Sequence, residues 1–143
     1  MNNQLPPVSR TSGDYHMWME GRVRFGDLDP LGHANNNSIG NFFDDARVKL
    51  LMEMGINQIR GDVQCVMAKI TLEFLAELHI FDDVRIAQRV PHIGRTSFVI
   101  HSAVFRGDQC MATGDAVCVL IDTATRKPTP VTDDMRARLV PYV

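Results

Sequence analysis

A single long segment with helical periodicity stands in a chain whose other patterned segments are typical of β-strands. Its apolar residues recur at steps of three and four over residues 37–54, and Gly55 follows as a helix stop. The strand-like segments span 15–25, 64–74, 83–90, 97–105 and 111–121. One helix cannot cover both faces of a parallel sheet, and short turns join the later strands. We therefore expect an α+β fold in which the helix packs on one face of a mostly antiparallel sheet.

The segment at 64–74 alternates between apolar and polar residues, as a strand with one buried face does. Its apolar face is predicted to hold Val66, Ala68, Ile70, Leu72 and Phe74. A sheet covered by one helix leaves an edge or its other face bare, which predicts pairing with a second copy of the chain. A short capped helix is also expected at 132–139.

Composition limits the classes of protein to which the chain can belong. It has 143 residues, 45% hydrophobic and 22% charged, which predicts one packed domain, placed at 14–143 after a loose lead-in at 1–13. The formal net charge of −2 argues against a nucleic-acid binder. No apolar run reaches the roughly 18 residues of a membrane span, and the first residues lack the apolar core of a secretory signal. The expected location is the cytoplasm.

The three cysteines are predicted to be reduced thiols in the core. Cys65, Cys110 and Cys118 lie in apolar, strand-like segments and have no C-x-x-C spacing. No basic neighbour in the sequence marks any of them as a reactive thiolate.

Residues 24–37 join the first strand to the helix and are dense in polar groups. Asp27 and Asp29 are followed by a proline, a glycine and His33, and then by three consecutive asparagines. A carboxylate here lies beside the free N–H groups of a helix N-terminus, where negative charge is stabilised. The segment therefore offers an acid or base next to a site for an oxyanion. Asp29 alone also fits a turn carboxylate that binds its own backbone.

Two further residues of this junction compete for a catalytic role. Asp27 would share one face with Asp29 if the strand continued that far, but we rank it below Asp29 and expect a structural role. His33 is a candidate general base, although a histidine beside glycine in a turn is more often a structural hydrogen-bonder. No second histidine, cysteine or carboxylate lies at ligand spacing from His33, so no metal site is expected.

Four segments, in order along the chain, resemble the hotdog-fold thioesterases of the 4-hydroxybenzoyl-CoA thioesterase superfamily. Residues 27–36 match D-x-D-x-x-G-H-x-N-N, and residues 43–47 match F-x-x-A-R. Further on, residues 93–98 match I-G-R-T-S-F and residues 122–128 match D-x-x-T-R-K-P. The chain departs from the family pattern at Ile39, where a tyrosine is usual, and at Gly40, where the residue is usually larger.

The resemblance implies a hotdog fold, in which one long central helix is wrapped by a curved antiparallel sheet of five to six strands. It also implies homodimers or homotetramers with acyl-CoA sites at the dimer interface. The activity implied is hydrolysis of an acyl-CoA to the free acid and CoA, with no cofactor apart from the CoA of the substrate. Asp29 matches the motif position that acts as nucleophile or general base, and Asn36 matches the position whose amide binds the carbonyl oxygen.

The predicted site residues fall into two groups. The catalytic group is Asp29, Asn36 and His33. The group that contacts CoA or the acyl chain is Arg95, Thr96, Ser97, Ile39 and Phe43, although Arg95 alone also fits a solvated strand residue.

Three other functions stay open on the sequence. The first is a hotdog protein that binds acyl-CoA or acyl-carrier protein without hydrolysis. The second is a hydratase or dehydratase on acyl thioesters, which needs a histidine with an acidic partner. The third is a purely structural dimer. The acyl group itself is not disclosed by the sequence.

Overall fold

The computed structural model describes residues 4–143, which form a five-stranded sheet, two α-helices and three short 3-10 helices. The strands are β1 (Met17–Arg22), β2 (Val63–Phe74), β3 (Asp83–Ile93), β4 (Ser97–Arg106) and β5 (Gln109–Asp122). The α-helices are α1 (Asn36–Glu53) and α2 (Asp133–Leu139), and the 3-10 helices are Ser12–Asp14, Phe25–Asp27 and Val140–Tyr142. The strand order is β1-β3-β4-β5-β2, and every neighbouring pair is antiparallel. The α+β prediction is therefore confirmed.

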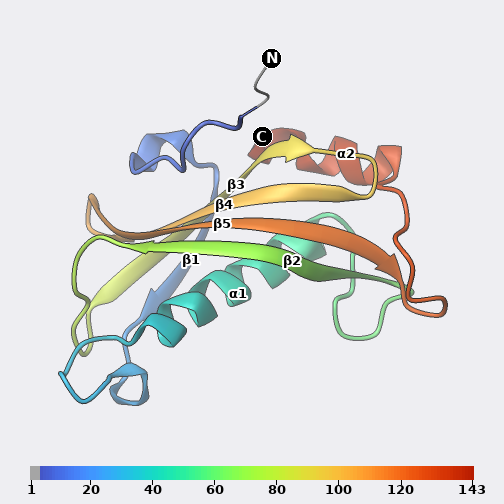
Figure 1. Ribbon diagram of the computed structural model, residues 1–143. Coiled ribbons are helices and arrows are strands. Elements are labelled where there is room, and N and C mark those ends of the chain that lie inside the picture. Colours follow the sequence, from blue (N-terminus) through green and yellow to red (C-terminus); the bar gives the residue numbers. More distant parts are fainter. Residues whose placement is uncertain (1–3) are drawn as a thin grey trace.

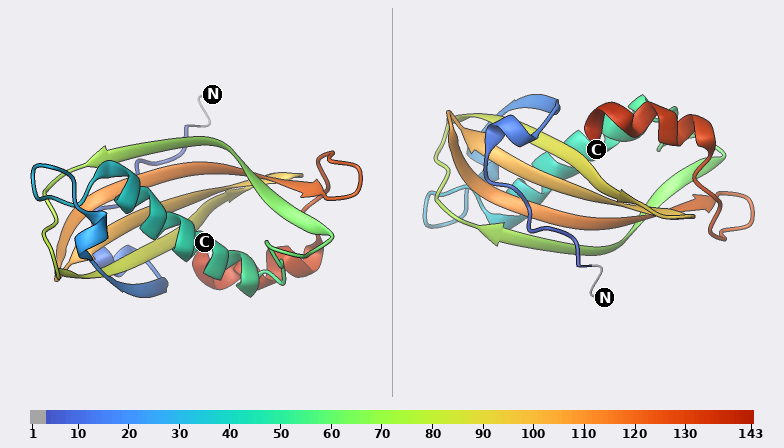
Figure 2. Two further views of the ribbon diagram at one scale, coloured as in Figure 1. Left: turned by 90° about the horizontal axis from the view of Figure 1, so that it is seen from below. Right: turned by 90° about the horizontal axis from the view of Figure 1, so that it is seen from above.

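The curved sheet wraps around α1, which lies across its concave face (Figure 1; Figure 2, left). One side of the helix is buried against the sheet, through Ile39, Phe42, Phe43, Ala46, Leu50 and Leu51. The first half of α1 packs on residues of β3, β4 and β5, and the second half packs on a cluster that also includes Leu139 of α2. This burial supplies the core that a sheet of this size needs on one face. Within the described residues, no helix has the length and apolar character to cross a membrane.

Phe43 of α1 packs closely on Gly114 of β5. A Cβ atom added to Gly114 would lie 3.0 Å from Phe43 Cδ2 and 3.2 Å from Leu72 Cδ2. Glycine at this position therefore lets the phenyl ring lie directly on the sheet. Gly40, one turn earlier in α1, is different, because an added Cβ would meet only Leu72 Cδ1, at 3.9 Å.

The helix begins where its first N–H groups find a side-chain acceptor. Asn35 is the N-cap, and its Oδ1 accepts the Ser38 N–H at 2.9 Å. The helix starts at Asn36, one residue before the predicted 37, and ends at Glu53. Gly55 has a φ of +83°, the left-handed conformation that suits a residue just past a helix end.

The predicted first strand, 15–25, is too long at both ends. β1 stops at Arg22, where its regular pairing with β3 ends: Val23 N–H donates to Asp82 O at 3.0 Å, but Val23 O accepts from Phe81 N–H at 2.8 Å, so two residues lie opposite one. A 3-10 helix follows at Phe25–Asp27. The alternation of apolar and polar residues in the sequence continues past the end of β1.

The predicted face of β2 is wrong at Val66, because a bulge at Ala68 changes the register. Before the bulge Cys65 and Met67 pair with Leu120 and Cys118, and after it Ile70 pairs with Ala116. Since side chains alternate between faces, Val66 points away from the face that carries Cys65. The other strands extend their predicted ranges by one to three residues at an end.

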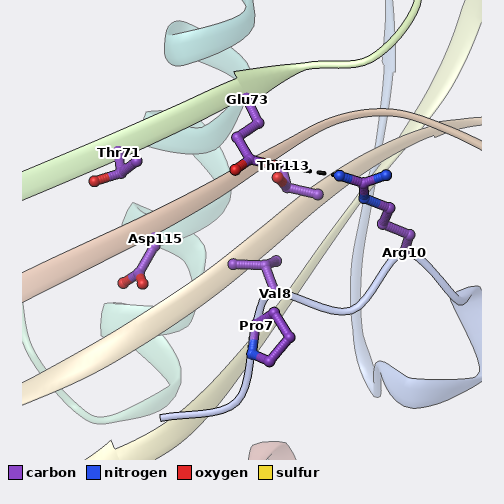
Figure 3. Close-up of a pocket in the computed structure, with 7 residues that line it drawn as sticks. All are labelled: Pro7, Val8, Arg10, Thr71, Glu73, Thr113 and Asp115. Atoms are coloured by element: carbon purple, nitrogen blue, oxygen red, sulfur yellow. Dashed lines mark hydrogen bonds and ion pairs between the residues drawn. The ribbon is translucent and has the colours of Figure 1, made fainter. Parts of the chain in front are cut away.

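Residues 7–10 cross the convex face of the sheet, opposite α1 (Figure 2, right). The Arg10 guanidinium pairs with Glu73 of β2 at 3.3 Å, and a pocket of about 520 Å³ lies beneath this segment (Figure 3).

His101 of β4 is 2% exposed, and its Nε2 lies 3.7 Å from Asp115 Oδ2 without forming a hydrogen bond in the described residues. A buried imidazole without a hydrogen-bond partner is costly to charge.

Alanine at Gly40 of α1 and alanine at Gly114 of β5 should have opposite effects on the stability of the fold. Gly40→Ala should stabilise the fold by about 0.5–1 kcal/mol, because the added methyl fits and a helix-interior glycine is removed. Gly114→Ala should destabilise it by about 1–3 kcal/mol, because the methyl overlaps Phe43. Urea unfolding of both variants measures these changes, and an unchanged midpoint for Gly114→Ala would contradict the close packing.

His101 should make the fold less stable in mild acid. Burial lowers the pKa of His101, and Arg89 lowers it further, whereas Asp115 opposes both. The unfolded chain, with an ordinary histidine pKa of about 6.5, then binds the proton more tightly than the folded chain. This contribution to stability is complete above about pH 6.5 and is lost as the pH falls toward the lower folded-state pKa. Melting temperatures between about pH 7 and 5 should fall less steeply for His101→Gln than for the wild type, while the exposed control His92→Gln should keep the wild-type slope.

Candidate active site

A pocket of about 260 Å³ lies where the loop after β1, the start of α1 and the chain after β2 meet. It is lined by Asp29, His33, Ala34, Asn36, Ile39, Phe74, Leu75, Ala76, Glu77 and Leu78. The fold thus brings together four of the predicted site residues, Asp29, His33, Asn36 and Ile39. Ile39 is 3% exposed and Phe74 is 43% exposed, so the apolar lining runs from the core to the outer edge of β2.

The Asp29 carboxylate is held in place by its own turn. Its Oδ1 accepts the Leu31 N–H at 2.9 Å and the His33 N–H at 3.3 Å. The Asp29 N–H donates to His33 O at 2.8 Å, and Gly32 takes the left-handed φ of +81° that closes the turn. Asp29 therefore has the backbone bonds of a turn carboxylate, as one interpretation of the sequence predicts. Its Oδ2 has no hydrogen-bond partner within residues 4–143, so one oxygen remains free to act.

Asp27 has a structural position rather than a place beside Asp29 in the pocket. It is 7% exposed, and its Oδ2 accepts the Arg24 N–H at 2.8 Å, which caps the 3-10 helix Phe25–Asp27. Its carbonyl oxygen accepts the Asn35 N–H at 2.8 Å, next to the N-terminus of α1. Because β1 ends before this point, the shared strand face expected from the i, i+2 spacing does not form.

The start of α1 presents free backbone donors to the pocket. Asn35 Oδ1 caps Ser38, but no acceptor for the Asn36 or Asn37 N–H is found in the part of the chain that the structure describes. Asn36 lines the pocket, as does Asp29. Free N–H groups at the positive end of a helix dipole stabilise a carboxylate, a phosphate or an oxyanion.

His33 has partners that its sequence neighbours did not indicate. Its Nε2 lies 3.1 Å from Glu77 Oε2, and its ring meets the His79 ring edge-on with centroids 5.5 Å apart. Glu77 and His79 follow β2, far along the chain from His33, so a search for ligand spacing around His33 misses them. Only the pairing of the loop after β1 with the segment before β3 brings them together.

The other predicted contact residues lie outside this pocket. Phe43 is 2% exposed and packs in the core, against Gly114. Arg95, Thr96 and Ser97 are at the start of β4, where Ser97 pairs with Val119. That end of the sheet carries the first residues of β2, whereas the pocket touches its last residue, Phe74. Within one chain, Arg95 is therefore far along the sheet from Asp29.

A larger pocket and the three cysteines lie outside this candidate site. The larger pocket beneath residues 7–10 opens on the convex face, away from Asp29 and α1. Cys65, Cys110 and Cys118 are free, and the neighbouring Cys118 together with burial raises the pKa of the Cys65 thiol. Burial raises the pKa of the Cys110 thiol as well, whereas the hydrogen bond with Cys65 lowers the pKa of Cys118. Cys65 and Cys118 are buried, as predicted for core thiols, and Cys110 is half-buried.

The architecture matches solved hotdog-fold structures. The PA5185 protein from Pseudomonas aeruginosa superposes with a TM-score of 0.85 at 24% identity, over 92% of this chain and 94% of that chain. A thioesterase superfamily protein from Jannaschia sp. CCS1 superposes with a TM-score of 0.82 at 28% identity, over 88% and 82%. A thioesterase from Thermus thermophilus, solved with coenzyme A and Zn, gives 0.79 at 26% identity, over 88% and 92%. The chain is a hotdog-fold protein, with the long helix and the curved antiparallel sheet that the resemblance implied.

The family follows from the sequence match. Residues 23–139 match the family model of the thioesterase-like superfamily. This range includes the loop after β1, all of α1 and strands β2 to β5. The chain belongs to the thioesterase-like superfamily.

Proposed function

We propose that this protein hydrolyses an acyl-CoA thioester to the free acid and CoA. One observation carries the proposal: the same pocket is lined by Asp29 and by Asn36, whose N–H has no acceptor within residues 4–143. Thioester hydrolysis needs a base or nucleophile beside the carbonyl carbon and donors for its oxygen. Membership of the thioesterase-like superfamily supports the same class of reaction. CoA as the carrier is supported by the Thermus thermophilus thioesterase, which was solved with coenzyme A.

Asp29 is suited to either of two routes. As a general base, it takes a proton from water while the water oxygen attacks the thioester carbon. As a nucleophile, its free Oδ2 attacks that carbon, and water then cleaves the resulting anhydride. In both routes the C–S bond breaks, CoA leaves as a thiolate that takes up a proton, and the acid is released. The hydrogen bonds from Leu31 and His33 fix the carboxylate for both routes.

The start of α1 is suited to the charge that develops on the carbonyl oxygen. The tetrahedral intermediate carries a negative oxygen, and the Asn36 N–H stabilises it more than it stabilises the neutral carbonyl. The acyl group then lies along Ile39, Phe74 and Leu75, which give the pocket its apolar lining. The side chains lining this pocket fit either an aromatic or an aliphatic acyl group.

A second copy of the chain would bring the predicted CoA residues to this pocket. β2 is an edge strand of 12 residues, and Val66, Ile70, Phe74 and Leu75 on or next to it are each 36–43% exposed. Long apolar edges of this kind pair with another strand. If two β2 strands pair antiparallel about a two-fold axis, the first residues of one face the last residues of the other. The partner subunit's Arg95 then lies at the end of the sheet where Asp29 lies, and its guanidinium suits a CoA phosphate.

A second candidate is a hydratase acting on an unsaturated acyl thioester. It is favoured by one observation, the 3.1 Å contact between His33 Nε2 and Glu77 Oε2, since this reaction uses a histidine with an acidic partner. An enoyl-CoA in the substrate panel separates the two: hydration consumes the conjugated double bond without releasing CoA, whereas hydrolysis releases it.

Asp29→Asn should abolish most of the activity while keeping the fold. The asparagine oxygen still accepts from Leu31 and His33, so the turn is preserved, but it is neither a base nor a nucleophile. CoA release from a panel of aromatic and short-, medium- and long-chain acyl-CoAs, followed with a thiol reagent, should fall in kcat by at least about 100-fold.

The matched control is Asp45→Asn, which removes an exposed carboxylate of α1 outside the pocket and should leave turnover unchanged. Turnover by Asp29→Asn at the wild-type rate would refute the role of Asp29. Tight acyl-CoA binding without turnover of any thioester by the wild type would favour a binding protein instead.

Ile70→Lys should break the proposed pairing through β2. Ile70 is 43% exposed on this edge strand, and a charge in the middle of the interface would remain unpaired and partly buried. Light scattering coupled to size exclusion should show a mass of two or four chains for the wild type and one chain for the variant, with loss of CoA release. The control Ile59→Lys changes an isoleucine that is 80% exposed and lies before β2, and it should keep the wild-type mass. An Ile70→Lys variant with wild-type mass and activity would contradict the pairing.

A further inference from the structure

Three potential metal-ligand side chains meet at the rim of the pocket. His33 comes from the loop before α1, and Glu77 and His79 come from the segment between β2 and β3. One ligand atom of each lies within 4.8 Å of the other two. His33 Nε2 is 3.1 Å from Glu77 Oε2, and His79 Nε2 is 3.8 Å from that same oxygen.

These separations match those of ligands around one small cation. Two ligands bound to zinc at about 2.0–2.1 Å in a tetrahedron are about 3.3 Å from each other. The two distances to Glu77 Oε2 lie on either side of that value. The side chains of Glu77 and His79 are 62% and 51% exposed, so surrounding packing leaves both free to adjust to an ion.

The backbone already holds the two segments together. The Ala34 N–H donates to Leu78 O at 2.8 Å, so the residues that follow His33 and precede His79 are bonded directly. A tight turn then fixes His79: its N–H donates to Asp82 Oδ2 at 2.8 Å, and the Asp82 N–H returns to His79 O at 3.1 Å. The backbone that carries these ligands is therefore already ordered before an ion binds, which lowers the entropic cost of binding.

An outer carboxylate faces the ring nitrogen of His79 that points away from Glu77. His79 Nδ1 lies 3.9 Å from Asp82 Oδ2, while Nε2 faces Glu77. Histidines that bind metals commonly direct their second nitrogen at a carboxylate, which fixes the tautomer that leaves the other nitrogen free to ligate. Asp82 is itself held by Arg106, at 3.0 Å.

We propose that His33, Glu77 and His79 form a binding site for a divalent transition-metal ion of the zinc class. Two imidazoles select such an ion over calcium or magnesium, which prefer oxygen ligands. Three protein ligands leave the remaining coordination position to water or to a ligand atom in the pocket, since His33 and Glu77 both line it. The proposal rests on these three side chains alone and does not depend on thioester hydrolysis.

Binding is tested on the untagged full chain with Zn²⁺ and Co²⁺ as probes. Calorimetry with Zn²⁺ should give one equivalent per chain, and Co²⁺ should give the visible absorption of a tetrahedral or five-coordinate ion. His79→Ala and Glu77→Gln, both at exposed positions, should each weaken binding by at least about tenfold. The control His92→Ala removes an exposed histidine outside the cluster and should bind as the wild type does.

Three results would overturn the assignment. The first is absence of binding by the wild type at metal concentrations far above that of the protein. The second is equal affinity in the wild type, His79→Ala and Glu77→Gln. The third is a thiolate-to-cobalt charge-transfer band, which would place the ion on a cysteine. Because none of these readouts involves turnover, failure of the metal site and failure of the proposed hydrolysis remain distinguishable.

Discussion

The packing of one helix against one curved sheet fixes everything else in this molecule. Phe43 lies directly on Gly114, and the buried side of α1 fills the concave face along its length. That placement puts the N-terminus of α1 at the end of the sheet where β2 ends and β3 begins. Two backbone hydrogen bonds then pin the start of the helix, from Ala34 to Leu78 and from Asn35 to Asp27. The free N–H groups of the first helical turn therefore lie at the pocket, which Asn36 lines.

The turn around Asp29 shows how structural and chemical roles coexist in one side chain. Asp29 Oδ1 accepts two backbone N–H groups and closes the loop, which on its own explains a carboxylate beside proline and glycine. These bonds engage one oxygen and leave the other without a partner in residues 4–143. A carboxylate that is oriented by its own turn needs no reorganisation when a substrate arrives. The structural and the catalytic interpretations of Asp29 are therefore compatible, and the structural bonds assist the proposed chemistry.

Local sequence patterns predicted what depends on local physics. The periodicity of residues 37–54 located α1 within one residue at each end, because the buried face, the Asn35 cap and the Gly55 stop are all set by local sequence. The failures arise where distant segments compete for the chain. The regular pairing of β1 with β3 ends after Arg22 and the chain turns into a 3-10 helix at Phe25, so alternation overran the end of β1. A bulge at Ala68 reverses the face of Val66, and no propensity marks it. Glu77 and His79 could not be joined to His33 from spacing, because the contact between the loop after β1 and the segment before β3 forms only in the complete fold.

The separation of Arg95 from Asp29 carries the strongest argument about assembly. The motif at 93–98 and the motif at 27–36 are both matched by this chain, yet β4 begins at one end of the sheet and the pocket lies at the other. If both segments serve one substrate, no hinge within a single sheet can unite them, since the strands between them are continuously hydrogen-bonded. An antiparallel pairing of two β2 edges does so by symmetry, and the apolar side chains exposed along β2 are those that such a pairing would cover. In the proposed dimer, the bare edge and the divided motif would be two consequences of one arrangement, in which each chain would supply half of two sites.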